Sequence, residues 1–136
     1  MPQTTVLFYQ EADERKTVPL VDWLDELPRK VQAKCQAYLK QLEDYGHELR
    51  RPIADYLRDG IYELRPSYQG VHYRMLYFFP KAEKSKAGVP LSIVVVSHGL
   101  AKEGKVPDLE IDRAVERKNR FEAQPRRHTF RPTLKG

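Results

Sequence analysis

Two neighbouring segments, residues 60–66 and 70–79, alternate between apolar and charged side chains with the two-residue period of a β-strand. Aromatic and aliphatic residues stabilise a strand by burial against a core, whereas charged residues keep to solvent. The alternation therefore predicts a sheet with one core face and one exposed, charged face. Only Ser67–Gly70 separate the two strands, so they are predicted to pair as an antiparallel hairpin. The core side comprises Tyr62, Leu64, Tyr73, Met75 and Tyr77, and the charged side comprises Glu63, Arg65, His72 and Arg74.

Apolar residues recur with a helical period in three other parts of the chain. The first is Val18–Leu27, and the second runs from Pro28 to Tyr45, where Gly46 ends the pattern. These two helices are predicted to form a hairpin packed on one face of the sheet. A last helix is predicted from Pro107, because carboxylates close behind this proline favour the positive end of the helix dipole.

Two further short apolar runs, residues 4–9 and 91–99, are typical of strands, whereas Pro52–Asp59 is predicted to be a connector. Strands thus separate from helices along the chain, which predicts an α+β fold with a mostly antiparallel sheet. A length of 136 residues favours a single domain. We expect this domain to span residues 1–123, and the basic, proline-containing segment 124–136 to be a disordered tail.

Composition argues against several classes of protein. No run approaches the roughly 18 apolar residues that a membrane-spanning helix needs, and the N-terminus lacks a basic region followed by an apolar stretch. The chain is therefore expected to be cytoplasmic, with no membrane partner. Its single cysteine, Cys35, excludes an internal disulfide and a cysteine-based zinc site, and the four histidines lack the spacing of metal ligands. No metal is predicted.

The positive charge of the chain is unevenly distributed. The formal net charge is +5, and residues 113–136 carry 8 Lys and Arg against 2 Asp and Glu. Residues 60–107, which contain the strands, carry 7 basic and 3 acidic residues. Such a distribution predicts attraction to polyanions, nucleic acid above all, through a salt-dependent contact with phosphates. The alternative is a basic segment that only keeps the domain soluble.

Four short motifs occur in this chain. They are Leu57–Arg65 (LRDGIYELR), Tyr73–Phe78 (YRMLYF), Ser97–Lys102 (SHGLAK) and a last helix that opens at Pro107 and contains Ala114 and Arg117. With them the chain resembles the RelE/ParE superfamily of toxins from bacterial type II toxin-antitoxin modules, and within it the phage-derived, HigB-like branch. The resemblance covers about residues 4–122 and implies a RelE-like α+β fold.

The resemblance implies a toxin that cuts mRNA, usually on the ribosome, and that a cognate antitoxin neutralises, often one with a helix-turn-helix domain. Members of this kind use no metal or other cofactor. In their reaction a ribose 2′-hydroxyl attacks the adjacent phosphate. The chemistry needs a proton acceptor, cations that face the developing charge, and a proton donor for the leaving 5′-oxygen.

The resemblance also implies which residues form the site. Arg65, Arg74, His98 and Lys102 are the candidate catalytic residues, and Arg65, Arg74, Lys102 and Lys105 are the candidate RNA-binding residues. Two positions depart from the family pattern. Leu100 stands where an aromatic residue is often found, and Glu103 stands where many relatives have a second lysine.

Purely structural roles are open for two of these candidates. Arg74 could form a cross-strand ion pair with Glu63 on a solvated face, and His98 could be a satisfied core residue. Two other functions also fit the sequence. The first is inhibition of DNA gyrase without catalysis, as in the ParE branch, and the second is a non-toxic module that binds nucleic acid or protein. His98 and Lys102 favour RNA cleavage.

Overall fold

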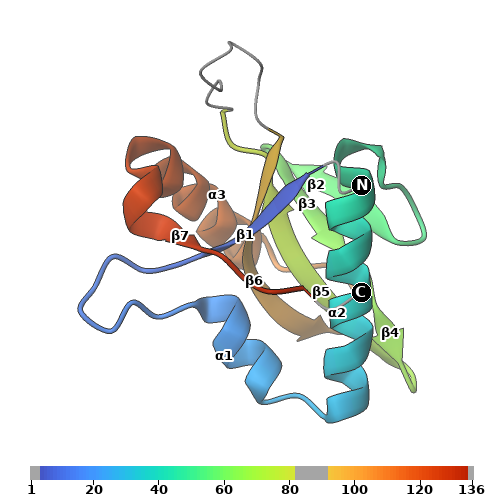
Figure 1. The fold of residues 1–136 in the computed structure, drawn as a ribbon. Coiled ribbons are helices and arrows are strands. Elements are labelled where there is room, and N and C mark those ends of the chain that lie inside the picture. The colour runs from blue at the N-terminus through green and yellow to red at the C-terminus, as the bar shows by residue number, and fades with distance from the viewer. Residues whose placement is uncertain (1–3, 82–91, 135–136) are drawn as a thin grey trace.

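The computed structural model describes residues 4–81 and 92–134, which form a seven-stranded sheet and three α-helices (Figure 1). Leu91 and residues 135–136, which belong to a predicted strand and to the predicted tail, lie outside this part. The elements are β1 (Thr5–Tyr9), α1 (Pro19–Asp25), α2 (Arg29–Tyr45), β2 (Ala54–Arg58), β3 (Ile61–Leu64), β4 (Ser67–Tyr68), β5 (Val71–Phe78), β6 (Ile93–Lys102), α3 (Asp108–Ala123) and β7 (Thr129–Phe130). Two 3₁₀ turns, Gly46–Glu48 and Pro125–His128, follow α2 and α3.

The sheet confirms the predicted α+β class. Its strand order is β2-β3-β5-β6-β1-β7, with β4 paired to β5, and every pair is antiparallel except β1 with β6. The prediction that Pro52–Asp59 is only a connector is wrong, because this segment contains the edge strand β2. The sequence of β2, ADYLR, has too few apolar residues to show a strand pattern, and its extended form depends on hydrogen bonds to β3.

Helices cover both faces of the sheet (Figure 1). The predicted core side, with Leu64, Met75 and Tyr77, packs against the hairpin of α1 and α2. The opposite side was predicted to be exposed, but Leu76 and Phe78 on that side pack against α3. The charged face is therefore not a free surface, and its middle forms a second core. The α3 residues that cover it are Ile111, Ala114 and Phe121.

Along one edge of β5 the backbone pairing is interrupted between β3 and β4, and the candidate site lies beside this interruption. Strand β3 ends at Leu64, and pairing with β5 resumes only at Ser67, opposite His72. Between them Pro66 has no N–H to donate, although its carbonyl accepts the Tyr73 N–H at 2.8 Å. The hairpin then turns at Gln69 and Gly70, whose φ angles of 48° and 80° suit a tight two-residue turn.

The segment after α3, predicted to be disordered, instead docks on the sheet. Strand β7 pairs with the edge of β1. The His128 ring stacks on Tyr9 with centroids 5.0 Å apart, and its Nδ1 lies 2.9 Å from the carbonyl oxygen of Gln10. Phe130 stacks on Phe8 at 6.0 Å. Two isolated rings leave no periodic pattern in the sequence, so their burial shows only once their partners on β1 are placed.

Deletion of residues 124–136 should therefore destabilise the domain rather than only remove charge. Loss of the His128 and Phe130 contacts should lower the free energy of unfolding by about 3 kcal/mol, since each ring loses buried apolar area. Urea denaturation of the truncated chain would measure it. A variant with Arg126→Gln and Arg127→Gln is the control, because it keeps β7 and should unfold like the wild type. Equal stability of the truncated chain would contradict the docking.

No helix within residues 4–81 and 92–134 is long and apolar enough to cross a membrane.

Candidate functional site

A cationic pocket of about 340 Å³ opens beside the break between β3 and β4. Four of its lining side chains are Lys or Arg, one is a histidine, and none is acidic. Helix α2 contributes two lining residues spaced four apart, which lie on one face of a helix. The lining residues are Lys34 and Tyr38 from α2, Arg51 and Pro52 from the loop before β2, Arg65, Ser67 from β4, and His72 and Arg74 from β5.

Two of the lining arginines, Arg65 and Arg74, share one buried carboxylate, that of Glu63. Glu63 and Arg74 are each only 3% exposed. Arg74 Nε forms an ion pair with Glu63 Oε1 at 3.3 Å, and Arg65 Nη1 donates a hydrogen bond to the other carboxylate oxygen. Arg74 Nη1 also donates to the Tyr73 carbonyl at 2.8 Å. Burial lowers the pKa of Arg74, and the charge of Glu63 opposes this shift.

The cluster of Arg65, Arg74 and Glu63 has an excess of positive charge, because two arginines share one carboxylate. A buried ion pair is costly to desolvate, so a carboxylate at this depth holds the guanidinium groups in place and partly neutralises them. Arg65 keeps 22% of its side chain exposed, and Arg74 still lines the pocket. Both can therefore present N–H donors to an anion from the pocket side.

Lys102 lies at the end of β6, directly opposite His72 on β5. Its Nζ donates a hydrogen bond to the Gly104 carbonyl. Partial burial, and next the positive charge of Arg74, lower the pKa of the Lys102 ammonium. This lysine therefore stands close to the cationic pocket. Lys105, three residues further on, is exposed on the loop before α3 and does not line the pocket.

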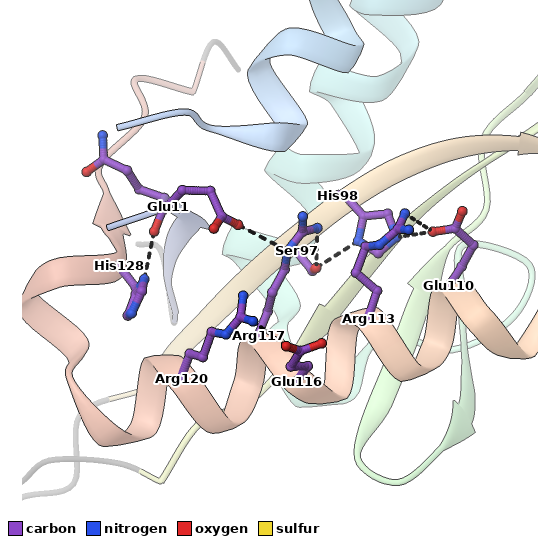
Figure 2. A network of polar contacts seen from close by, with 10 residues as sticks. Glu11, Ser97, His98, Glu110, Arg113, Glu116, Arg117, Arg120 and His128 are labelled. Carbon is purple, nitrogen blue, oxygen red and sulfur yellow. Dashed lines mark hydrogen bonds and ion pairs between the residues drawn. The ribbon is translucent and has the colours of Figure 1, made fainter. Parts of the chain in front are cut away.

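His98 lies in a different environment, between β6 and α3 (Figure 2). Its Nδ1 is 2.7 Å from Ser97 Oγ, and its Nε2 is 3.1 Å from Glu110 Oε1. Figure 2 shows the network continuing through Arg117, which lies 3.4 Å from Ser97 Oγ and 3.5 Å from Glu11 Oε1. The ring is 6% exposed, and both of its nitrogens are already in contact with neighbouring side chains.

A β-bulge explains why Ser97 and His98 can both take part in this network. His98 pairs with Leu76 and Val96 with Tyr77, so Ser97 is an extra residue between two adjacent pairs. The bulge interrupts the strict alternation of sides that holds elsewhere in β6. Burial, and next the charge of Arg117, lower the pKa of His98 to about 4. His98 is therefore neutral at pH 7 and serves here as a connection between β6 and α3.

This histidine should make the stability of the domain depend on pH. Its pKa is about 4 in the folded state and 6.5 ordinarily, so the unfolded chain binds more protons between these values. The contribution of neutral His98 to the free energy of unfolding should be fully present above pH 6.5. It should decrease as the pH drops toward 4, by up to about 3 kcal/mol. Thermal unfolding of the wild type and of His98→Gln across that window would show it. If the unfolding temperatures of the two proteins changed with pH in the same way, the lowered pKa of His98 would be contradicted.

The structure thus brings three of the predicted site residues together and leaves two apart. Arg65 and Arg74 line the cationic pocket and Lys102 lies beside it without lining it, whereas His98 and Lys105 belong to other surroundings. The alternation in the sequence places His72 on the same side of the strand as Arg74, and this could have indicated that His72 belongs to the site. The sequence alone assigns no function to His72. Lys34, Tyr38 and Arg51 come from α2 and the loop before β2, and only the packing of the hairpin reveals them. Within the described residues, no group of three or more His, Cys, Asp or Glu side chains could hold a metal ion.

A comparison with protein families adds one finding. The model of a family described as phage derived protein Gp49-like (DUF891) matches residues 22–119, which is more than half of the chain. The matched range includes α2, strands β2 to β6 and most of α3, and therefore every residue that lines the cationic pocket. No curated protein matches the sequence.

Proposed function

The chain belongs to the family of phage-derived Gp49-like proteins, a RelE-like, toxin-like family, and from this we propose that it is the toxin of a type II toxin-antitoxin module and cleaves mRNA. We propose further that the chain belongs to the HigB-like branch of these toxins. It cuts messages during translation, and it acts in the cytoplasm.

The cationic pocket is the observation that carries the proposal. Four Lys and Arg side chains line a space of about 340 Å³ without an acidic neighbour on its wall, and Lys102 stands beside it. A phosphodiester is a compact anion that accepts hydrogen bonds from several directions, and guanidinium groups match its geometry with paired N–H donors. The pocket therefore suits a phosphate of an RNA strand better than a neutral or cationic ligand.

In the proposed reaction the ribose 2′-oxygen attacks the adjacent phosphorus, and the bond from phosphorus to the 5′-oxygen breaks. Negative charge grows on the phosphoryl oxygens in the transition state, where Arg65 and Arg74 would donate hydrogen bonds to them. A fixed donor of this kind contributes about 3 kcal/mol to catalysis. Lys102 would face the leaving 5′-oxygen and supply its proton, and the lowered pKa of this ammonium suits such a transfer.

The walls of the pocket would hold the flanking nucleotides. Lys34 and Arg51, the latter paired with Asp55, offer positive charge from α2 and from the loop before β2. The Tyr38 ring offers a surface on which a base can stack. Lys105 would contact the RNA further out, on the loop before α3. His98 has no part in this mechanism, because Ser97 and Glu110 already contact both of its ring nitrogens.

Replacement of Lys34 by Gln should weaken RNA binding without abolishing it. Loss of one phosphate contact should raise the dissociation constant several-fold, and should reduce the slope of log affinity against log salt by about 0.7 for a single strand. Fluorescence anisotropy with a 2′-O-methyl oligonucleotide, which cannot be cut, measures both quantities. Lys40→Gln is the matched control, since Lys40 lies on the same helix and pairs with Glu43. An unchanged salt slope in Lys34→Gln would exclude a phosphate contact there.

We propose further that the protein binds a cognate antitoxin with a helix-turn-helix domain and acidic segments, and that it acts at the ribosome. The formal net charge of +5 favours an acidic partner. Co-purification of the tagged chain with the product of a neighbouring gene of its native operon would identify that partner.

A short induction of the protein in growing cells tests the proposed function. We expect growth arrest together with rapid decay of messages, whereas chromosomal DNA stays intact. Gyrase-dependent DNA breaks with stable messages would instead favour the ParE-like alternative. Normal growth at a verified protein level would point to a non-toxic binding module. Either of these two results would contradict RNA cleavage.

A further inference from the structure

His72 is the histidine that lines the cationic pocket, and it is exposed. The other three histidines of the chain have different surroundings. His47 stacks on Phe79 with centroids 3.6 Å apart, His98 is enclosed between β6 and α3, and His128 is buried against Tyr9. His72 therefore places an exposed imidazole at the ligand space of the pocket.

Ser67 fixes the orientation of this imidazole. The two residues face one another across the β4–β5 pair, and Ser67 Oγ lies 2.8 Å from His72 Nδ1. When Nδ1 carries the proton and donates it to Ser67 Oγ, the lone pair is on Nε2. The ring is then a proton acceptor at the nitrogen that Ser67 does not contact.

Cations surround this acceptor from every element packed around the pocket. Lys102 is its partner across the β5–β6 pair, and Arg74 lies two residues further along the same strand. Lys34 and Tyr38 face the pocket from α2, and Arg51 and Arg65 face it from the loops on either side of β2 and β3. A phosphate held by these cations would place its ribose within reach of the imidazole. Two carboxylates pair with these cations. Glu63 is buried and engaged by Arg65 and Arg74. Asp55 forms an ion pair with Arg51 at 2.8 Å. Both carboxylates are therefore already engaged by arginines, which leaves them unsuited to accept a proton.

We infer that His72 is the proton acceptor of the cleavage reaction and that Ser67 is its positioning residue; the inference rests on the proposed function. Nε2 of His72 takes the proton of the 2′-hydroxyl as the 2′-oxygen forms its bond to phosphorus. The bond to the 5′-oxygen breaks, and the Lys102 ammonium gives that oxygen a proton. The products are a 2′,3′-cyclic phosphate and a 5′-hydroxyl end. Proton transfer from His72 back to Lys102, directly or through water, restores the starting state.

Single-turnover cleavage of a message in a translating extract tests the inference, with wild type, His72→Gln, His72→Ala, Ser67→Ala and Ser67→Thr. We expect His72→Gln to lower the rate constant 10²-fold to 10⁴-fold, the range of general acid and base catalysis, and to remove the acidic limb of the pH profile. Added imidazole should partly restore His72→Ala. Ser67→Ala should lower the rate and shift that limb, and Ser67→Thr should restore both.

Three outcomes would overturn the inference. The first is cleavage by His72→Gln at the wild-type rate. The second is a slower His72→Gln whose pH profile keeps the wild-type limb. The third is a loss of rate that a weaker dissociation constant for a 2′-O-methyl oligonucleotide fully explains. Since His72 is exposed, we expect its variants to unfold at the wild-type temperature, which a thermal scan checks. A wild-type protein that cuts no message would remove the proposed function itself, which separates that failure from a failure at His72.

Discussion

Replacement of Arg74 by Gln should reduce the rate constant of message cleavage by about 10²-fold to 10³-fold, the cost of removing one fixed donor from a transition state. Arg74 is 3% exposed, held by Glu63 and by the Tyr73 carbonyl, and lines the cationic pocket. Its donors are therefore oriented before the RNA arrives and need little reorganisation during the reaction. Single-turnover cleavage in a translating extract would measure the effect.

Two matched variants sharpen this prediction. Arg74→Lys keeps the charge but loses the paired donors, so its rate should fall between those of the wild type and Arg74→Gln. Arg15→Gln removes an exposed arginine from the loop before α1, outside the lining of the pocket, and should leave the rate unchanged. Equal rates for Arg74→Gln and Arg15→Gln would show that Arg74 only supports the fold.

Glu63→Gln should be the most destabilising polar substitution at this site. The carboxylate is 3% exposed and compensates both Arg65 and Arg74, so its neutralisation leaves the fully buried Arg74 charge unpaired. Removal of one partner of a buried ion pair costs about 3 to 5 kcal/mol, and we expect a loss of that size in the free energy of unfolding. Urea denaturation followed by circular dichroism would measure it.

The double variant Glu63→Leu, Arg74→Met is the control for this effect. It removes the buried acid together with its most buried partner, and apolar residues of similar volume can replace such pairs at little cost. It should therefore be more stable than Glu63→Gln while being inactive. A double variant that is less stable than Glu63→Gln would show that the two side chains support the fold through packing rather than through charge.

The period of two in β3 and β5 was enough to predict which residues share a side. Tyr62, Met75 and Tyr77 do pack on the helical hairpin, and Arg74 does pair with Glu63. The same period could not predict exposure, because burial of the second side depends on α3, which lies 30 residues beyond β5 in the chain. The Glu63–Arg74 ion pair, which would be a weak contact on a solvated face, is likewise buried, and Lys34 and Tyr38 of α2 line the same pocket as Arg74.

The segment around His98 shows a second limit of prediction from the sequence. The sequence places His98 and Gly99 in one motif, and a resemblance alone suggests a catalytic histidine. In the structure a Cβ on Gly99 would lie 2.2 Å from Cε3 of Trp23, so this glycine is required by the close approach of α1. The bulge at Ser97 directs its neighbour His98 toward α3. Both features are tertiary, and neither leaves a periodic signal in the sequence.

The pocket itself could be predicted only in part. Arg65, Arg74 and Lys102 follow from the strands and from the family motifs. Lys34 and Arg51 lie outside these motifs in the sequence, and only the fold brings them to the pocket. His72 stood on the correct side of the pattern without a reason to prefer it over His98. The place of His72 in the lining of the pocket and its exposure supply that reason, since His98 is buried. The contact that orients its ring comes from Ser67, on a strand of only two residues.

Mapping of message ends would show whether this chain cuts RNA with the residues of the cationic pocket. Purified wild type, Arg74→Gln and Arg15→Gln would be added separately to one translating extract, and the new 5′ ends would be sequenced after capture of 5′-hydroxyl termini. We expect discrete new ends within coding sequence for the wild type and for Arg15→Gln, and almost none for Arg74→Gln. Messages that stay intact with the wild type, or the same ends at the same yield with Arg74→Gln, would contradict it.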